Sequence, residues 1–145
     1  MFDTVVIATD GSSSVRRGVK AAVDLTERFG GTIHALYVVD RTKIDTSPAE
    51  IQSDVEHAIE TAGEEALSYV REQTAGQDVV TAVREGTPAE EIIDYADSVG
   101  ADAIAMGTRG RNGDHAFLLG SVAEAVVRQA PMPVLTVRQL EADSQ

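Results

Sequence analysis

The chain carries Ala101-Asp-Ala-Ile-Ala-Met106, then Gly107-Thr-Arg-Gly110 and, after nine further residues, Gly120-Ser121. The apolar run before the glycines is typical of a buried strand, and Val122-Ala-Glu-Ala-Val-Val-Arg128 after them is typical of a helix. Glycine at a strand end lets the backbone approach a ligand closely, because no Cβ stands in the way. A helix N-terminus adds N–H groups without helical partners and a partial positive charge. The arrangement predicts an anion site, most simply one for phosphates.

Two common phosphate-binding motifs, G-x-x-x-x-G-K-[ST] and G-x-G-x-x-G, do not occur in the sequence. The spacing that is present, G-x2-G-x9-G-S, resembles the nucleotide-binding motif of the universal stress protein family. Val5-Val-Ile-Ala-Thr-Asp10-Gly-Ser12 is similar to the first strand of that family with its terminal aspartate, and Ala130-Pro-Met-Pro-Val-Leu-Thr-Val137 fits its end. The resemblance covers the chain from Phe2 to Arg138.

Strand-like and helix-like segments alternate along the chain. Apolar, β-branched runs predict strands over 4–9, 32–39, 78–84, 101–106 and 134–137, and helical periodicity fills most of the sequence between them. Residues 40–47 are expected to be a polar connection, Pro48 to open a long helix, and Thr87-Pro-Ala-Glu90 to form a capping box. This alternation predicts an α/β fold, a single doubly wound parallel sheet with helices on both faces.

The family resemblance implies a five-stranded order 3-2-1-4-5. Strands one and four then meet where the winding reverses, which is where such sheets bind ligands. Asp10 and Gly107 end those two strands and are therefore expected to meet. One domain over residues 1–138 and a short polar C-terminal tail over 139–145 are predicted.

The predicted nucleotide site combines the glycine motif with residues that the resemblance supplies. Gly107, Gly110, Gly120 and the backbone N–H groups of Ser121 and Val122 are expected around the phosphates, and Ser121 is also a candidate helix N-cap. By resemblance, Asp10 accepts ribose hydroxyls, and the backbone of Val38 reads the adenine edge. For Asp10 the alternative is a helix cap or turn, and for Val38 it is plain strand core. Met106 either borders the nucleotide or packs in the core, and Arg109 either offsets phosphate charge or is solvated.

The resemblance implies an ATP-binding universal stress protein that acts as a switch or adaptor for an unidentified client. The sequence has no P-loop lysine, placed general base or carboxylate pair for Mg²⁺, so no catalytic or metal-ligating residue is assigned and slow ATP turnover at most is expected. Mg²⁺ carried on the phosphates stays an alternative. Two other functions stay open: an ATP-hydrolysing or nucleotidyl-transferring enzyme on the same scaffold, and a dimerisation module without nucleotide.

The composition limits which partners and surroundings the protein is expected to have. The net charge of −12 disfavours nucleic acid, and the sequence has no cysteine for disulfides or thiolate metal sites. No apolar run approaches the roughly 18 residues of a membrane span, and the N-terminus has no signal peptide pattern, so a cytoplasmic location is expected. Only two of the 12 basic residues are lysines, a composition similar to that of proteins from salt-loving organisms such as haloarchaea. An ordinary acidic cytosolic protein is the alternative.

The last predicted strand, Val134-Leu-Thr-Val137, falls at the end of the implied strand order. It is apolar and carries no charge, so nothing in its sequence blunts pairing with another chain. A homodimer formed through antiparallel pairing of this edge is therefore expected, and the family resemblance implies the same.

Overall fold

The chain folds around one five-stranded parallel sheet in the computed structural model, which describes residues 3–9, 16–74, 78–109 and 121–139. The strand order is β3-β2-β1-β4-β5, as the family resemblance implied, and each neighbouring pair is parallel. The strands are β1 (Thr4–Thr9), β2 (Thr32–Val39), β3 (Val79–Glu85), β4 (Ala103–Arg109) and β5 (Val134–Gln139). The helices are α1 (Arg16–Phe29), α2 (Arg41–Asp45), the 3-10 turn η2 (Ala49–Ile51), α3 (Gln52–Gln73), α4 (Pro88–Ser98) and α5 (Ser121–Gln129).

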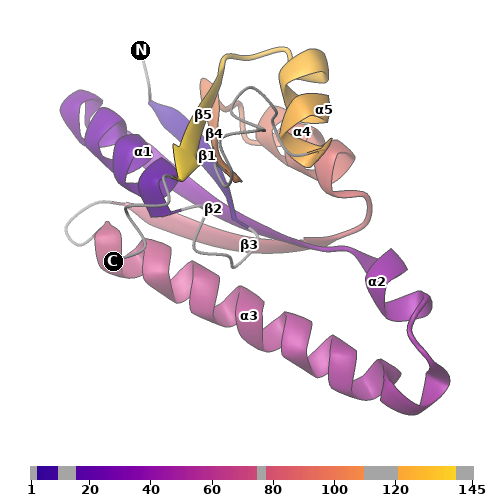
Figure 1. Cartoon of the computed structure of the whole chain (residues 1–145). Helices are drawn as coiled ribbons and strands as arrows, with labels where there is room; N and C mark the ends of the chain where they lie inside the picture. The colour runs from indigo at the N-terminus through magenta and orange to yellow at the C-terminus, as the bar shows by residue number, and fades with distance from the viewer. Residues whose placement is uncertain (1–2, 10–15, 75–77, 110–120, 140–145) are drawn as a thin grey trace.

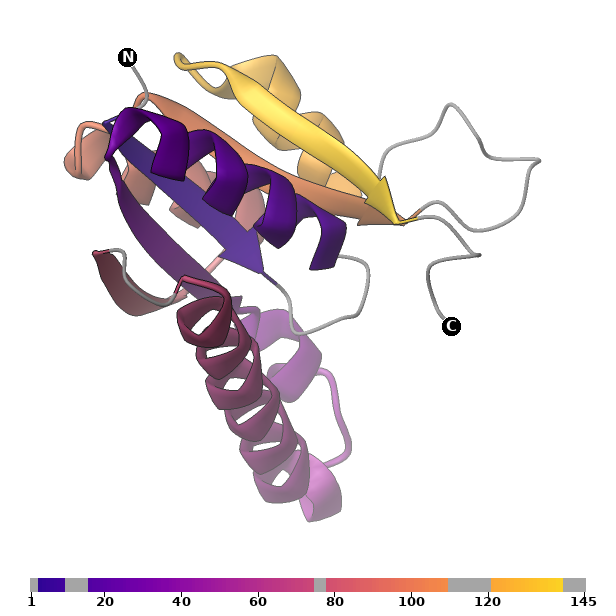
Figure 2. The ribbon, with the colours of Figure 1, turned by 90° about the vertical axis from the view of Figure 1, so that its left-hand side faces the viewer.

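Helices cover both faces of the sheet, as the alternation of segments predicted. Helices α1 and α3 lie on one face, and α4 and α5 lie on the other (Figures 1 and 2). Strand β1 shows why its sequence is apolar throughout: Val5 and Ile7 pack into the cluster under α1 and α3, whereas Val6 and Ala8 pack into the cluster under α4 and α5. A strand buried on both faces has no solvent-facing positions to fill with polar residues.

The connection between β2 and the long helix α3 differs from the sequence prediction in two places. Residues 41–45, expected to be irregular, form helix α2, whose N-cap Asp40 accepts a hydrogen bond from the backbone N–H of Thr42 at 3.0 Å. Pro48 does not open the long helix directly, because a 3-10 turn over Ala49–Ile51 comes first.

The capping box predicted at Thr87 was wrong. Helix α4 begins at Pro88 as predicted, with Thr87 at the N-cap position, but the Thr87 side chain makes no capping hydrogen bond.

Strands β3 and β5 form the two edges of the sheet. Strand β5 pairs with β4 alone among the strands, which confirms that the last strand is an edge. Within the residues that the structure describes, no helix is long and apolar enough to cross a membrane.

Candidate functional site

The winding of the sheet reverses next to β1, and here the strands have unequal lengths. The last paired residues of β1 are Thr9 with Tyr37 on β2 and Ala8 with Met106 on β4. Strand β2 continues to Val39 and β4 to Arg109, so both run past the end of β1. A doubly wound sheet binds its ligands at this position, beyond the carboxyl ends of the strands.

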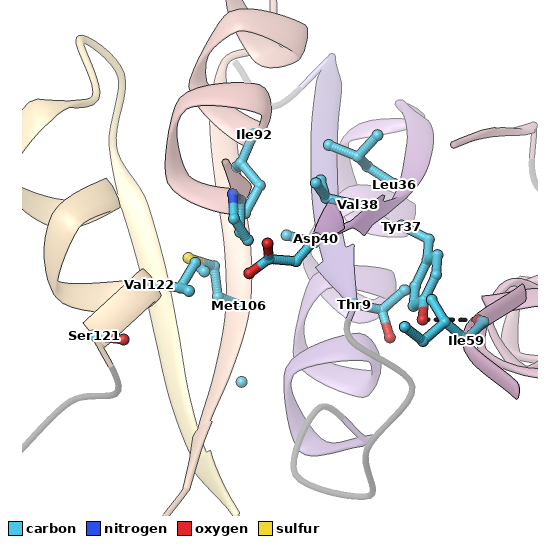
Figure 3. Close-up of a pocket in the computed structure, with 13 residues that line it drawn as sticks. Thr9, Leu36, Tyr37, Val38, Asp40, Ile59, Ile92, Met106, Ser121 and Val122 are labelled. Carbon is cyan, nitrogen blue, oxygen red and sulfur yellow. Dashed lines mark hydrogen bonds between the residues drawn. The ribbon is translucent and has the colours of Figure 1, made fainter. Parts of the chain in front are cut away.

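A cavity of about 320 Å³ lies at this switch point. Six elements and one connecting residue contribute to its wall, and Figure 3 shows their side chains gathered around it. The lining residues are Ala8, Thr9, Leu36, Tyr37, Val38, Asp40, Ile59, Pro88, Ile92, Met106, Gly107, Ser121 and Val122. A mostly apolar wall with a few polar groups is the usual composition of a small-molecule site.

Five residues that the sequence analysis assigned to the nucleotide site lie on this wall: Val38, Met106, Gly107, Ser121 and Val122. They come from β2, β4 and the first turn of α5, so the fold brings together positions more than 80 residues apart. Asp10, Gly110 and Gly120 fall outside the described residues. Arg109 is the last residue of β4, and its side chain also lies outside the described part. The chemical roles of all nine stay predictions.

Backbone groups suited to an anion lie on the α5 side of the cavity. Helix α5 begins at Ser121 and runs for nine residues, and both Ser121 and Val122 line the cavity at its N-terminus. Gly107 on β4 lines the same region without a side chain. The helix dipole and the first-turn N–H groups favour a negative group on this side.

The opposite wall is mostly apolar, and one main-chain carbonyl, that of Val38, is directed beyond the end of β1. Thr32 donates its backbone N–H to Asp3 beside β1, whereas Ile33 donates to Asp78 on the β3 side. Because main-chain groups alternate along a strand, those of Val38 point to the β1 side. Strand β1 has its last paired residue one position earlier, at Thr9, so the Val38 carbonyl faces the region beyond β1.

Tyr37 fixes the wall on the α3 side. Its side chain is 6% exposed, and its hydroxyl donates to the backbone carbonyl of Ile59 at 2.9 Å (Figure 3). Helix α3 comes this close because residue 63 is glycine: a Cβ there would lie 2.5 Å from two carbons of the Tyr37 ring. Tyr37 and Ile59 were not among the predicted site residues, since nothing local in the sequence marks a contact between a strand and a helix 22 residues further on.

Asp40 is also new, and it is the one formally charged residue on the wall that the structure describes. Figure 3 shows its carboxylate directed into the cavity, toward the side chains of Met106 and Val122. The sequence held a signal for it, because Asp40 directly follows strand β2, next to the switch point, much as Asp10 follows β1. The remaining lining residues are brought there only by the topology: Ala8, Thr9, Leu36, Pro88 and Ile92.

The neighbour of Asp40 anchors helix α2. Arg41 forms a 2.7 Å hydrogen-bonded ion pair with Glu56 on α3 and longer pairs with Asp45 at 3.7 Å and Glu85 at 3.8 Å. The hydrogen bond to Glu56 is the main cause that raises the pKa of Arg41 above its ordinary value. Arg41 is the first residue of α2, and its ion pairs therefore connect the start of this helix to both α3 and β3.

The fold and the cavity define an α/β protein with a ligand site at the switch point of its sheet. Comparison with known proteins identifies the family. The model of the universal stress protein family matches residues 1–138, and the chain belongs to that family. The universal stress protein MJ0531 of Methanocaldococcus jannaschii is 37% identical over 142 residues, covering 96% of this chain and 84% of the relative.

Solved structures of the family share the fold. The universal stress protein UspA from Lactobacillus plantarum superposes with a TM-score of 0.78 at 25% identity, covering 94% of this chain and 98% of that one. Two others were solved with nucleotides. One, from Archaeoglobus fulgidus, is in complex with dAMP (TM-score 0.67, 22% identity, 94% and 99% covered), and another universal stress protein is in complex with cAMP (TM-score 0.66, 24% identity, 93% and 96% covered).

Proposed function

We propose that this protein binds an adenine nucleotide, ATP in the first place, in the cavity at the switch point and acts as a nucleotide-dependent switch or adaptor in a stress response. The observation that carries the proposal is the gathering of Val38, Met106, Gly107, Ser121 and Val122, chosen from sequence alone, around one cavity. The complexes of two related folds with dAMP and cAMP support an adenine nucleotide as the ligand class.

The volume and lining of the cavity agree with a nucleoside-sized ligand. About 320 Å³ lies at the lower end of the range for small-molecule sites, roughly 300–1,000 Å³. In the proposed pose the base lies between Val38 and Met106, and the phosphates extend past Gly107 toward the N-terminus of α5. Asp10 would accept the ribose hydroxyls, and Gly110 and Gly120 would border the phosphates. Mg²⁺, where present, would ride on the phosphates and keep mostly water ligands.

A binding function without rapid catalysis fits the sequence best. The P-loop lysine that polarises phosphates in many ATPases does not occur in the chain, and no general base is assigned. We therefore propose slow ATP hydrolysis at most, with the nucleotide acting as a signal to a client. The cytoplasm is the proposed location.

The proposal includes a homodimer formed through β5. The edge position of β5 supports it, as does the exposure of Leu135, which is 36% accessible. Two copies pairing antiparallel would satisfy the outer main-chain groups of both edges and close a two-fold symmetry.

A matched pair of substitutions on α5 tests the nucleotide site. Val122 lines the cavity, whereas Val127 on the same helix is 45% exposed and does not. Because phenylalanine and valine have similar helix propensities, Val122→Phe should fill the cavity and Val127→Phe should serve as its control. Calorimetry in high-salt buffer should show that Val122→Phe loses ATP binding while Val127→Phe retains it. Equal affinity of the two variants would place the site elsewhere.

The glycine motif gives a second variant. Gly120→Val should fold and lose affinity for ATP, because the new side chain would occupy space expected to hold phosphate. A folded Gly120→Val protein with unchanged affinity would contradict the assignment of Gly120.

A further inference from the structure

Among the described residues that line the cavity, Asp40 carries the one formal charge. In the proposed pose this carboxylate has no part in binding the phosphates. Its Oδ1 accepts the backbone N–H of Thr42 at 3.0 Å. None of the hydrogen bonds seen among the described residues involves its Oδ2. Figure 3 shows the carboxylate directed toward the apolar side chains of Met106 and Val122. Asp40 is only partly buried, so a ligand that fills the cavity removes this oxygen from solvent and has to supply a hydrogen-bond donor in return.

The structure holds this carboxylate in place. Asp40 is the N-cap of α2, and the next residue, Arg41, is paired with Glu56 at 2.7 Å. Ile44 of the same short helix is 2% exposed and belongs to the core cluster under α1 and α3. These contacts fix the backbone on the C-terminal side of Asp40, and strand β2 fixes it on the N-terminal side. A fixed acceptor discriminates between ligands better than a mobile one, because it does not turn to suit the wrong group.

The charge of Asp40 also determines which end of a nucleotide approaches it. A phosphate beside the carboxylate would be repelled, whereas the N-terminus of α5 and Gly107 favour a phosphate. Val38, whose carbonyl faces the region beyond β1, precedes Asp40 by two residues. The end of the ligand that reaches Asp40 is therefore the nucleobase.

We propose that Asp40 makes the cavity selective for a purine with a 6-amino group over a purine with a 6-oxo group. This inference rests on the proposed nucleotide site and adds a selectivity residue to it. The amino group of adenine can donate a hydrogen to Oδ2 of Asp40. Hypoxanthine and guanine present a carbonyl oxygen at the same position, so that two acceptors would face each other across the contact.

The size of the effect follows from the type of contact. A hydrogen bond to a charged group corresponds to about 10- to 100-fold in affinity, and an unmatched acceptor pair adds to the discrimination. We expect ATP to bind the wild-type protein at least about tenfold more tightly than ITP, which carries hypoxanthine.

Asp40→Asn tests the inference without removing the helix cap. Asparagine caps helices as well as aspartate does, so its side-chain oxygen can still accept the N–H of Thr42. With that oxygen on Thr42, the amide NH2 takes the place of Oδ2, where it can donate to a 6-oxo group but cannot accept from a 6-amino group. Asp54→Asn is the matched control, because it makes the same charge change near the start of a helix, α3, at an exposed side chain that does not line the cavity.

Calorimetric titration of the three proteins with ATP and with ITP gives the readout. In Asp40→Asn, the affinity ratio of ATP to ITP should fall to about unity or below, whereas Asp54→Asn should keep the wild-type ratio. A wild-type protein that binds both nucleotides equally, or an Asp40→Asn variant with the wild-type ratio, would overturn the selectivity role and leave nucleotide binding standing. Loss of the ratio in both variants would overturn it too, because a general charge effect would then suffice. A wild-type protein that binds neither nucleotide would overturn the proposed function itself.

Discussion

Gly63→Ala is predicted to destabilise the protein, although alanine is the better helix former. The ideal Cβ at position 63 would lie 2.5 Å from Cδ2 and Cε2 of Tyr37, about 1 Å inside the usual 3.5–4.0 Å separation of packed carbons. The ring has little room to move, since Tyr37 is 6% exposed and its hydroxyl is bonded to the Ile59 carbonyl at 2.9 Å. The Cβ therefore has to push the ring or the helix away.

Three terms set the magnitude. Overpacking a well-filled core costs about 1–3 kcal/mol. Weakening the Tyr37 hydrogen bond costs about 0.5–1.5 kcal/mol more. The change from glycine to alanine inside a helix returns about 0.5–1 kcal/mol. The packing terms are larger, and the free energy of unfolding should fall by about 0.5–4 kcal/mol.

Urea unfolding of the wild type, the three single variants Gly63→Ala, Ala58→Gly and Tyr37→Leu, and the double variant Tyr37→Leu/Gly63→Ala measures this effect. Ala58→Gly on the exposed face of α3 calibrates helix propensity, because its environment contributes little else. Tyr37→Leu removes the ring, and in that background Gly63→Ala should cost at least about 1 kcal/mol less than in the wild type. Stabilisation of the wild-type protein by Gly63→Ala would refute the close approach of α3 to Tyr37. Since Tyr37 and Ile59 line the cavity, the variant should also bind ATP more weakly.

Three further predictions concern the dimer, salt and pH. Ile104 donates its N–H to the carbonyl of Pro133, so the main chain of Pro133 faces β4; because main-chain groups alternate along a strand, the N–H of Thr136 faces away from β4. Thr136→Pro should therefore remove a donor from the outer edge and give a monomer by light scattering. A folded variant that stays dimeric would place the interface elsewhere. With a net charge of −12, the melting temperature should fall as potassium chloride is lowered from about 1 M to about 0.01 M, where the Debye length grows from about 3 to about 30 Å; a flat profile would contradict the halophilic interpretation. Burial lowers the pKa of His34 below 6.5, and its Nδ1 lies 2.9 Å from the Tyr95 hydroxyl, so the unfolded chain takes up a proton more readily than the folded one. The contribution of His34 to the free energy of unfolding should therefore be full above pH 6.5 and decline below it. Urea titrations should find a smaller decline in His34→Gln.

The strands and the glycine side of the site were predictable because their signals are local. Residues such as Val5, Val6, Ile7 and Ala8 form one continuous apolar run, which is what a strand buried on both faces requires. Gly107, Ser121 and Val122 stand where a strand ends and a helix begins, and that junction was visible as a change of periodicity.

Helix α2 and the remaining cavity wall were not predictable in the same way. A five-residue helix has no measurable periodicity, and α2 depends on the Asp40 cap, the pairing of Arg41 with Glu56 and the burial of Ile44. Two of these contacts join residues that are distant in sequence. Pro88 and Ile92 reach the cavity only because α4 crosses the sheet beside the switch point. The capping box at Thr87 failed for a related reason: the pattern permits a side-chain hydrogen bond but does not require it.

Native mass spectrometry of freshly purified protein, before and after addition of ATP, is the sharpest test of nucleotide binding at the switch point. We expect one adenine nucleotide per chain, either carried through purification or acquired at saturating ATP, and loss of that mass shift in Val122→Phe. A wild-type protein that is folded and free of nucleotide in both spectra would refute nucleotide binding, since the cavity at the switch point would then serve some other ligand.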